Sequence, residues 1–297
     1  MNRRRFIQNT GMLTAMSLLP AYACQKAPHS KYKMGYQLFS IRDQMAKDPL
    51  ATLKALIAMG YESFETYGYE PDTDQIYGYT AQEFRSILDD LKVVAPSGHF
   101  GFDPFHFAEE AEILRFVDGC LKGAETMGMK YITWPWLAPE KRNPEGFKQL
   151  VIQLNRIGKH LQGSGIGLAF HNHGYEFEDH NGVKGYDMIL QETDPELIKL
   201  QLDMYWLKHS TDMTPQQLAD DQPGRYVMWH IKDMDKVTRD YTELGNGSID
   251  YTTYLPKAED SGLEFYFIEQ GGNFTVNSTE SAKASAEYFK ANLQQLI

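Results

Sequence analysis

The sequence contains only two cysteines, Cys24 and Cys120, among its 297 residues, so a disulfide framework is excluded as the source of its stability. Basic residues are also scarce, because 29 Lys and Arg stand against 40 Asp and Glu, for a net charge of −11. An acidic surface repels phosphate backbones, which argues against a nucleic-acid partner. No Gly-x-Gly-x-x-Gly follows the first apolar run, so a dinucleotide-binding fold lacks its main support. The chain does have 42% hydrophobic residues, enough for one large core.

The start of the chain differs from the rest. Arg3, Arg4 and Arg5 precede a modestly apolar stretch that is too short to span a membrane. Small residues then stand where a signal peptidase reads, directly before Cys24. The basic start resembles a twin-arginine export motif. We therefore expect residues 1–23 to be an export signal and residues 24–33 a tether. The mature protein is then expected in the periplasm, or anchored to the cell envelope through a lipid on Cys24.

From residue 34 to residue 297 the sequence repeats one theme, a short apolar run followed by a turn and a longer amphipathic stretch. This alternation, without a domain linker, predicts an α/β fold, a single (β/α)8 TIM barrel, with an open doubly wound sheet as the alternative. The expected strands are Met34–Phe39, Ser63–Thr66, Val94–His99, Tyr131–Trp134, Gly167–His171, Leu200–Met204, Val227–Ile231 and Phe265–Glu269. The expected helices are Leu50–Met59, Ala81–Leu91, Glu109–Met127, Asn143–Gln162, Asp212–Ala219, Tyr251–Ser261 and Thr279–Leu296.

Four residues of metal-ligand type stand at the ends of successive expected strands: His171, Asp203, His230 and Glu269. The carboxyl ends of barrel strands meet on one face, which carries the active site in barrel enzymes. One histidine at a strand end is usually a satisfied polar residue, but four ligand types at four successive strand ends are harder to explain that way. Two imidazoles and two carboxylates suit a divalent metal such as Mn, Zn, Co or Mg. We therefore expect these four side chains to hold one divalent cation.

Several segments together resemble the xylose-isomerase-like barrel superfamily, the sugar phosphate isomerase/epimerase group, over roughly residues 33–296. The resemblance implies a metal held by an acid, an Asp, a His and a Glu on the fifth to eighth strands. The last three match Asp203, His230 and Glu269, whereas His171 replaces the fifth-strand acid. That departure removes one carboxylate of a symmetric two-glutamate mechanism and makes the metal a stronger Lewis acid. The matching segments are Gly35–Arg42, Gly60–Glu65, Ser97–His99, His171–His173, Leu202–Trp206, His230–Asp233 and Ile268–Gln270.

Other side chains could complete a pocket around the metal. We expect Glu65 and His173 to transfer protons together with Glu269. The structural alternatives are an ion pair for Glu65, a solvated loop position for His173, an ion pair with Asp233 for Lys232, and core packing for the aromatic residues. The expected substrate contacts are Gln37, His99, Trp134, Tyr205, Trp206 and Lys232, and Trp136 also suits stacking on a sugar.

These features predict a divalent-metal-dependent isomerase or epimerase that removes a proton beside a carbonyl of an unphosphorylated sugar or keto-sugar. Export favours an unphosphorylated substrate, and the sequence has no Gly-rich phosphate loop. A lyase acting by β-elimination on 3-keto-glycosides, as similar barrels do, is the enzymatic alternative, and an exported sugar-binding barrel without catalysis is the other. A phosphodiesterase of the abasic-site endonuclease type would need more metal ligands and a basic surface. The expected partners are a small carbohydrate and a second copy of the chain.

Overall fold

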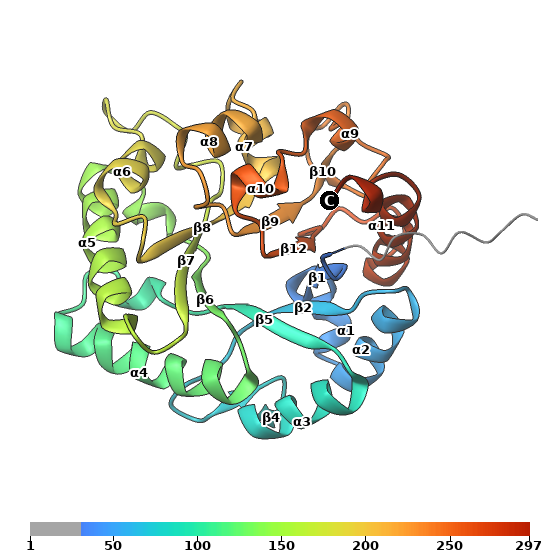
Figure 1. Cartoon of the computed structure of the whole chain (residues 1–297), viewed down its shortest axis with the longest axis horizontal. Helices are drawn as coiled ribbons and strands as arrows, with labels where there is room; N and C mark the ends of the chain where they lie inside the picture. The colour runs from blue at the N-terminus through green and yellow to red at the C-terminus, as the bar shows by residue number, and fades with distance from the viewer. Residues whose placement is uncertain (1–30) are drawn as a thin grey trace, which may run out of the picture.

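The computed structural model describes residues 31–297 as a closed barrel of parallel strands with helices outside it (Figure 1). The barrel order is β1-β12-β9-β8-β7-β6-β5-β2, which confirms the (β/α)8 prediction and excludes the doubly wound alternative. The predicted export signal and Cys24 lie outside the described residues. The barrel strands are β1 (Gly35–Gln37), β2 (Ser63–Tyr67), β5 (Val94–His99), β6 (Tyr131–Trp134), β7 (Gly167–His171), β8 (Ile198–Asp203), β9 (Met228–Ile231) and β12 (Phe265–Ile268).

The outer helices follow the amphipathic stretches of the sequence. The N-terminus of α3 has the capping box that Thr80 and Glu83 suggest. The expected helix over Tyr251–Ser261 is instead broken by Pro256, whose missing N–H ends the first piece. Three helices, α1, α6 and α7, were not predicted. The helices are α1 (Arg42–Met45), α2 (Pro49–Ala58), α3 (Ala81–Leu91), α4 (Glu110–Met127), α5 (Pro144–Leu161), α6 (Gly185–Glu192), α7 (Met204–Ser210), α8 (Pro215–Asp221), α9 (Tyr251–Tyr254), α10 (Ala258–Ser261) and α11 (Ser278–Asn292).

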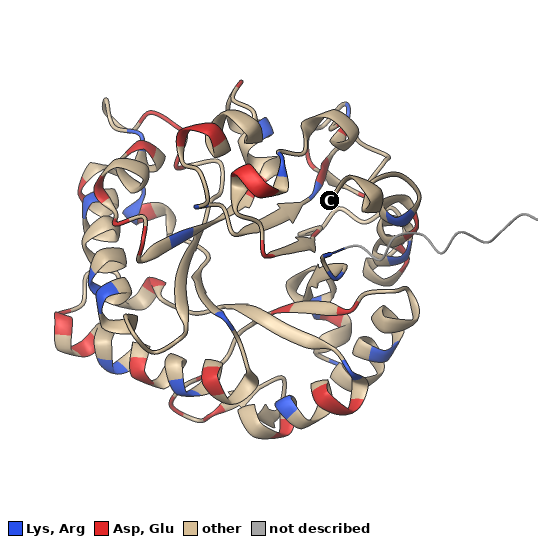
Figure 2. Cartoon of the chain, viewed as in Figure 1, with Lys and Arg blue, Asp and Glu red and all other residues tan. Residues whose placement is uncertain are grey.

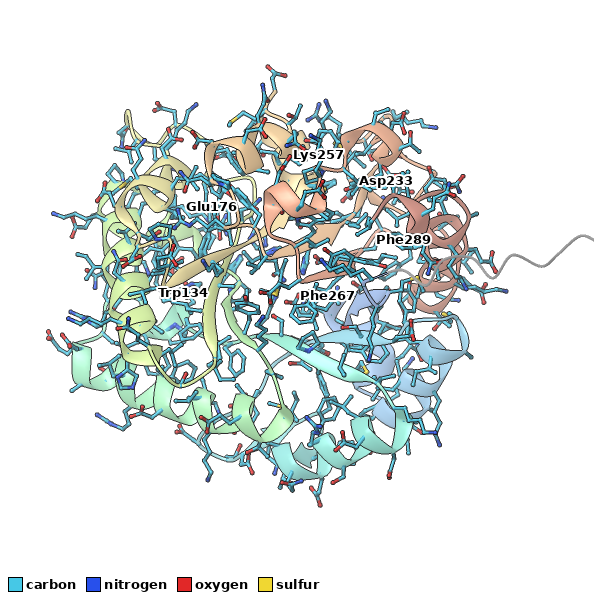
Figure 3. The ribbon with its side chains drawn as sticks, in the orientation of Figure 1. Trp134, Glu176, Asp233, Lys257, Phe267 and Phe289 are labelled. Carbon is cyan, nitrogen blue, oxygen red and sulfur yellow. The ribbon has the colours of Figure 1, made fainter. Side chains whose placement is uncertain are left out.

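Strand β12 illustrates how the barrel separates its two cores. Tyr266 points outward and stacks on Phe289 of α11 at 5.1 Å between ring centroids. The next residue, Phe267, points inward, where its ring lies 6.0 Å from that of His230 (Figure 3). A Cβ on Gly35 of β1 would lie 2.0 Å from the carbonyl oxygen of Tyr266. Only glycine therefore lets the first strand approach the last and close the barrel.

A buried carboxylate fixes the long excursion that follows β9. Asp233 begins β10 (Asp233–Met234), which pairs with β11 (Tyr241–Thr242). Its side chain accepts hydrogen bonds from the backbone N–H groups of Met234, Gly245, Gly247 and Ile249 at 2.8 to 3.1 Å. The alternative that Lys232 forms an ion pair with Asp233 is therefore wrong, because the Asp233 carboxylate instead accepts backbone hydrogen bonds from the loop.

Lys and Arg residues alternate with Asp and Glu residues along the outer helices in the view of Figure 2. Within residues 31–297, no helix combines the length and apolarity needed to cross a bilayer.

Candidate metal centre and pocket

The four predicted ligand residues converge at the carboxyl ends of four neighbouring strands. His171 ends β7, Asp203 ends β8, His230 lies in β9 and Glu269 directly follows β12. One ligand atom from each of them lies within 4.8 Å of every other. Two nitrogens and two oxygens at this spacing could hold one divalent cation.

His230 has different partners on its two ring nitrogens. Its Nδ1 atom lies 2.5 Å from Oε2 of Glu269 and 4.0 Å from Oδ2 of Asp203. Its Nε2 atom lies 2.5 Å from Oε2 of Glu65. Burial acts to lower the pKa of His230, but the carboxylates of Glu65 and Glu269 raise it to about 10. Without a metal the ring is therefore protonated at neutral pH, with Nε2–H donating to Glu65 and Nδ1–H donating to Glu269. Nδ1 faces the ligand cluster and becomes a ligand atom when a cation displaces its proton.

Lys232 contributes a buried positive charge to the same cluster. Its Nζ atom lies 2.8 Å from Oδ2 of Asp203 and 3.0 Å from Oε2 of Glu269. The other oxygen of Asp203 accepts the N–H of Trp206 and so caps α7. Burial acts to raise the pKa of Glu269, but the charges of Lys232 and His230 hold it below its ordinary value. Glu269 is therefore ionised at neutral pH.

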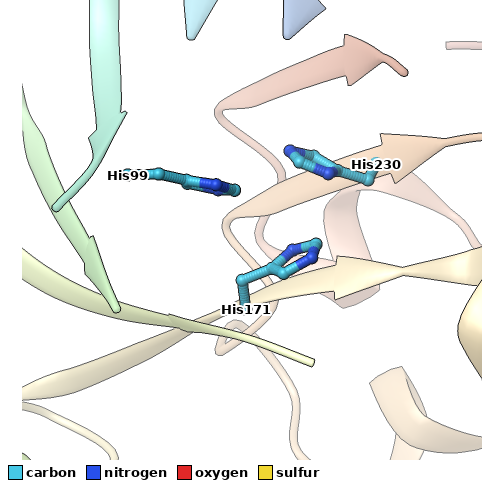
Figure 4. Close-up of side chains that lie close together, drawn as sticks. All are labelled: His99, His171 and His230. Carbon is cyan, nitrogen blue, oxygen red and sulfur yellow. The ribbon is translucent and has the colours of Figure 1, made fainter. Parts of the chain in front are cut away.

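Three imidazoles face one another beside the carboxylates (Figure 4). The ring of His171 lies 4.6 Å from that of His230 and 5.1 Å from that of His99. Burial, followed by the charge of His230, keeps the pKa of His171 well below its ordinary value, so this ring is neutral and able to ligate a metal. His99, predicted as a substrate contact, forms a second candidate ligand set with His171 and His230. The sequence pattern did not reveal that alternative.

Glu65 lies below the cluster, in the barrel interior. Its carboxylate is fully buried and accepts hydrogen bonds from Gln37, Ser97 and Gln201 at 2.6 to 2.7 Å. Two histidines complete its surroundings, with Nε2 of His230 at 2.5 Å and Nε2 of His99 at 3.2 Å from Oε2. Burial acts to raise the pKa of Glu65, but the neighbouring histidines lower it well below its ordinary value. Glu65 does not line the cavity, so the geometry gives it a supporting position and not the proton-transfer position predicted from the sequence.

A cavity of about 530 Å³ opens above the ligand cluster. Three aromatic wall residues come from segments outside the barrel strands: Phe39 from a 3-10 turn after β1, Trp136 from the loop after β6, and Tyr241 from β11. Of these three, only Trp136 was predicted to contact a sugar. The lining residues are Gln37, Phe39, Tyr67, Gly68, His99, Phe100, Gly101, Pro135, Trp136, His171, His173, Trp206, Lys232, Tyr241, Glu269 and Gly271.

Four of the six predicted substrate contacts line this cavity, but Trp134 and Tyr205 do not. Trp134 is fully buried and stacks on Phe102 at 5.0 Å, because its neighbour Thr133 takes the inward position on β6. Tyr205 already belongs to α7, where strand alternation no longer applies, and its hydroxyl donates to the carbonyl of Arg239. Both predictions of substrate contact are therefore wrong.

His173 lines the cavity, as a proton-transfer group must. Its backbone N–H donates to Glu176 at 2.8 Å, while its Nδ1 atom is buried and has no hydrogen-bond partner within residues 31–297. Burial lowers the pKa of His173 to about 3, so its imidazole is neutral at neutral pH. The solvated loop position considered as an alternative is wrong.

The family model of the xylose isomerase-like TIM barrel matches residues 53–292. The chain belongs to this family. None of the curated proteins compared with it matches. As a xylose isomerase-like barrel, it shares its fold with solved structures at low sequence identity.

A sugar phosphate isomerase/epimerase from Parabacteroides distasonis ATCC 8503 has 23% identity and a TM-score of 0.77, over 90% of this chain and 97% of that one. The probable 3-DHS dehydratase AsbF from Bacillus anthracis has 14% identity and a TM-score of 0.68, over 87% and 98%. The IolI protein, solved with a zinc atom, has 13% identity and a TM-score of 0.64, over 89% and 99%. At these identities the likeness shows that the fold is shared.

Proposed function

We propose that this protein is a divalent-metal-dependent isomerase or epimerase that removes a proton beside a carbonyl of an unphosphorylated sugar or keto-sugar. The observation that carries the proposal is the convergence of His171, Asp203, His230 and Glu269, whose ligand atoms lie within 4.8 Å of one another. The similarity to a sugar phosphate isomerase/epimerase supports the reaction class, and the zinc in IolI supports a metal in this fold.

The donor set fits a divalent cation. His171 and His230 offer imidazole nitrogens, Asp203 and Glu269 offer carboxylate oxygens, and Glu65 orients His230 from behind, as carboxylates do in many metal sites. When bound there, the cation supplies Lewis acidity that polarises a substrate carbonyl and lowers the pKa of the adjacent C–H.

Glu269 is the best placed base in this site. It lines the cavity, its side chain is 11% exposed, and it is ionised at neutral pH. The ammonium of Lys232, 3.0 Å away, then stabilises negative charge that develops on a substrate oxygen. His173 also lines the cavity, and its neutral imidazole is a second candidate proton-transfer group. Proton return to the same carbon gives an epimer, and return to the neighbouring carbon gives an isomer.

The charges around the cavity favour an unphosphorylated substrate. Among the described residues that line it, Lys232 is the only lysine or arginine, and its ammonium is already paired with two carboxylates. Of the arginines beside the lining residues, Arg42 donates to the carbonyls of Phe39 and Gly271, and Arg142 donates to that of Leu137. Neither arginine lines the cavity, so a phosphate there would lack the bidentate cationic partner it usually has.

β-Elimination on a keto-glycoside is the second candidate, favoured by the similarity to a probable dehydratase. It shares the first step, removal of a proton beside a carbonyl, and then loses a leaving group from the next carbon. The arginine-rich start of the sequence supports export to the periplasm, with a lipid on Cys24 as the anchored form.

The test is hydrogen exchange in D₂O. Purified, metal-loaded protein is incubated with a panel of sugars and keto-glycosides, and deuterium beside the carbonyl is followed by NMR and mass spectrometry. We expect incorporation that stops with a chelator and in Glu269→Gln. Isomer, epimer or eliminated product then distinguishes the reactions. If no sugar exchanges and His230→Ala changes nothing, the enzymatic proposal is overturned in favour of a sugar-binding barrel.

A further inference from the structure

The cavity is polar at its floor and aromatic at its mouth. His171 and Lys232 at the floor are each 2% exposed. Phe39 and Trp136, which line the same cavity, are each 41% exposed. They follow β1 and β6, strands that β2 and β5 separate in the barrel, so the two rings stand on different sides of the opening. A large aromatic ring left open to solvent at a cavity mouth is a common mark of a ligand contact.

Both rings are held in place before any ligand arrives. The guanidinium of Arg42 lies 4.3 Å from the ring centroid of Phe39, and the edge of Tyr67 packs on the same ring at 5.3 Å. The backbone carbonyl of Trp136 accepts the indole N–H of Trp134 at 2.9 Å, and Arg142 lies 5.6 Å from the Trp136 ring. Rings fixed in this way lose little freedom when a flat partner packs against them.

From this arrangement we propose that Phe39 and Trp136 form a subsite for a second, uncharged ring, joined by a glycosidic bond to the sugar that reacts at the floor. Arg42 and Arg142 pack on these rings and bond backbone carbonyls, but neither lines the cavity. The wall at the mouth is therefore aromatic and uncharged within the described residues, which suits an uncharged ring. The cavity volume of about 530 Å³ lies within the range of about 300–1,000 Å³ that is usual for small-molecule ligand pockets. The substrate is then a glycoside. The proposed function is needed only for the reaction at the floor of the cavity, and binding of the second ring does not depend on it.

Calorimetry on the metal-loaded full chain tests the subsite. The probes are the methyl glycoside, the phenyl glycoside and the disaccharide of one sugar, each in a gluco and a galacto series. We expect the two-ring probes to bind at least about tenfold more tightly than the methyl glycoside, a difference of about 1.4 kcal/mol. Trp136→Ala and Phe39→Ala should each reduce this difference and leave methyl glycoside binding unchanged. Phe107→Ala is the matched control, because Phe107 is 56% exposed but lies outside the cavity.

A preference for the phenyl glycoside alone supports an aromatic leaving group, and a preference for the disaccharide alone supports a second sugar. Equal binding of one-ring and two-ring probes, a preference that survives both substitutions, or no binding of any probe overturns the subsite. The two proposals fail separately. Two-ring preference without deuterium exchange retains the subsite and rejects the reaction, whereas exchange without that preference retains the reaction alone.

Discussion

The Nε2 atom of His230 lies 2.5 Å from Oε2 of Glu65, a carboxylate fully buried beneath the ligand cluster. The contact turns the Nδ1 atom of the same ring toward Asp203 and Glu269. A carboxylate in this position fixes the orientation of a ligand histidine and raises its basicity.

Glu65→Gln should therefore weaken metal binding, by about 10- to 100-fold, while leaving the four ligand residues in place. Calorimetric titration of the metal-free protein with Zn²⁺ and Mn²⁺ measures the loss. Glu62→Gln is the control, since Glu62 is an exposed carboxylate just before β2. Unchanged affinity in Glu65→Gln would mean that Glu65 does not support a metal ligand.

Lys232→Met should have opposite effects on metal affinity and on the stability of the metal-free protein. The Lys232 ammonium contacts an oxygen of each candidate ligand carboxylate. Two like unit charges about 4 Å apart repel each other by about 1 kcal/mol even in water, so the ammonium should oppose a divalent cation held by the same carboxylates. We expect metal affinity to rise several-fold or more. Without metal, two carboxylates lose their buried partner, which should cost about 3–5 kcal/mol of unfolding free energy.

The measurements are metal titration and urea unfolding with and without metal, and Lys236→Met, an exposed lysine on the following loop, is the control. A fall in metal affinity in Lys232→Met would contradict the competition between the ammonium and the cation.

Asp233→Ala should destabilise the protein through the loop that follows β10. Its carboxylate accepts four backbone N–H groups, and hydrogen bonds to a charged group contribute about 1.5–3 kcal/mol each at most. We expect a loss of about 2–5 kcal/mol in urea unfolding and faster proteolysis within residues 235–249. Asp90→Ala, at an exposed position of α3, should change neither. Unaltered proteolysis of the Asp233 variant would show that other contacts hold the loop.

Glu176 should give the protein a measurable pH dependence. Burial raises the pKa of this carboxyl to about 8 from an ordinary value of 4.5. An acid with a raised folded-state pKa contributes stability that is fully present below pH 4.5 and is lost as the pH rises toward 8. Glu176→Gln should remove that loss, raising the unfolding free energy at pH 8 by up to a few kcal/mol at about 1.4 kcal/mol per pH unit.

Urea unfolding of Glu176→Gln at pH 5 and pH 8 provides the comparison, and exposed Glu178→Gln is the control. Equal effects at the two pH values would show that this carboxyl is already ionised in the folded protein.

The strand pattern predicted the barrel and the convergence of His171, Asp203, His230 and Glu269. It could do so because the carboxyl ends of all the strands in a parallel barrel lie on the same face. The pattern did not predict which inward-facing side chains reach the cavity and which stay buried in the barrel interior. Glu65 is fully buried in the barrel interior, whereas Tyr67, two residues later on the same strand, lines the cavity. Tyr205 was misplaced because a helix begins directly after Asp203. Phe39 was missed as a wall residue because β1 ends at Gln37 and a 3-10 turn follows, so strand alternation no longer applies there. Tyr241 was missed because β11 lies outside the repeating strand–helix pattern.

The meeting of β1 and β12 at Gly35 ties the two ends of the described chain together. Glu269 comes directly after that seam, so the fourth ligand arrives only when the last strand docks beside the first. Metal binding should therefore require a closed barrel. A fragment ending before β12 should bind the cation poorly, and adding the missing C-terminal piece in trans should restore binding.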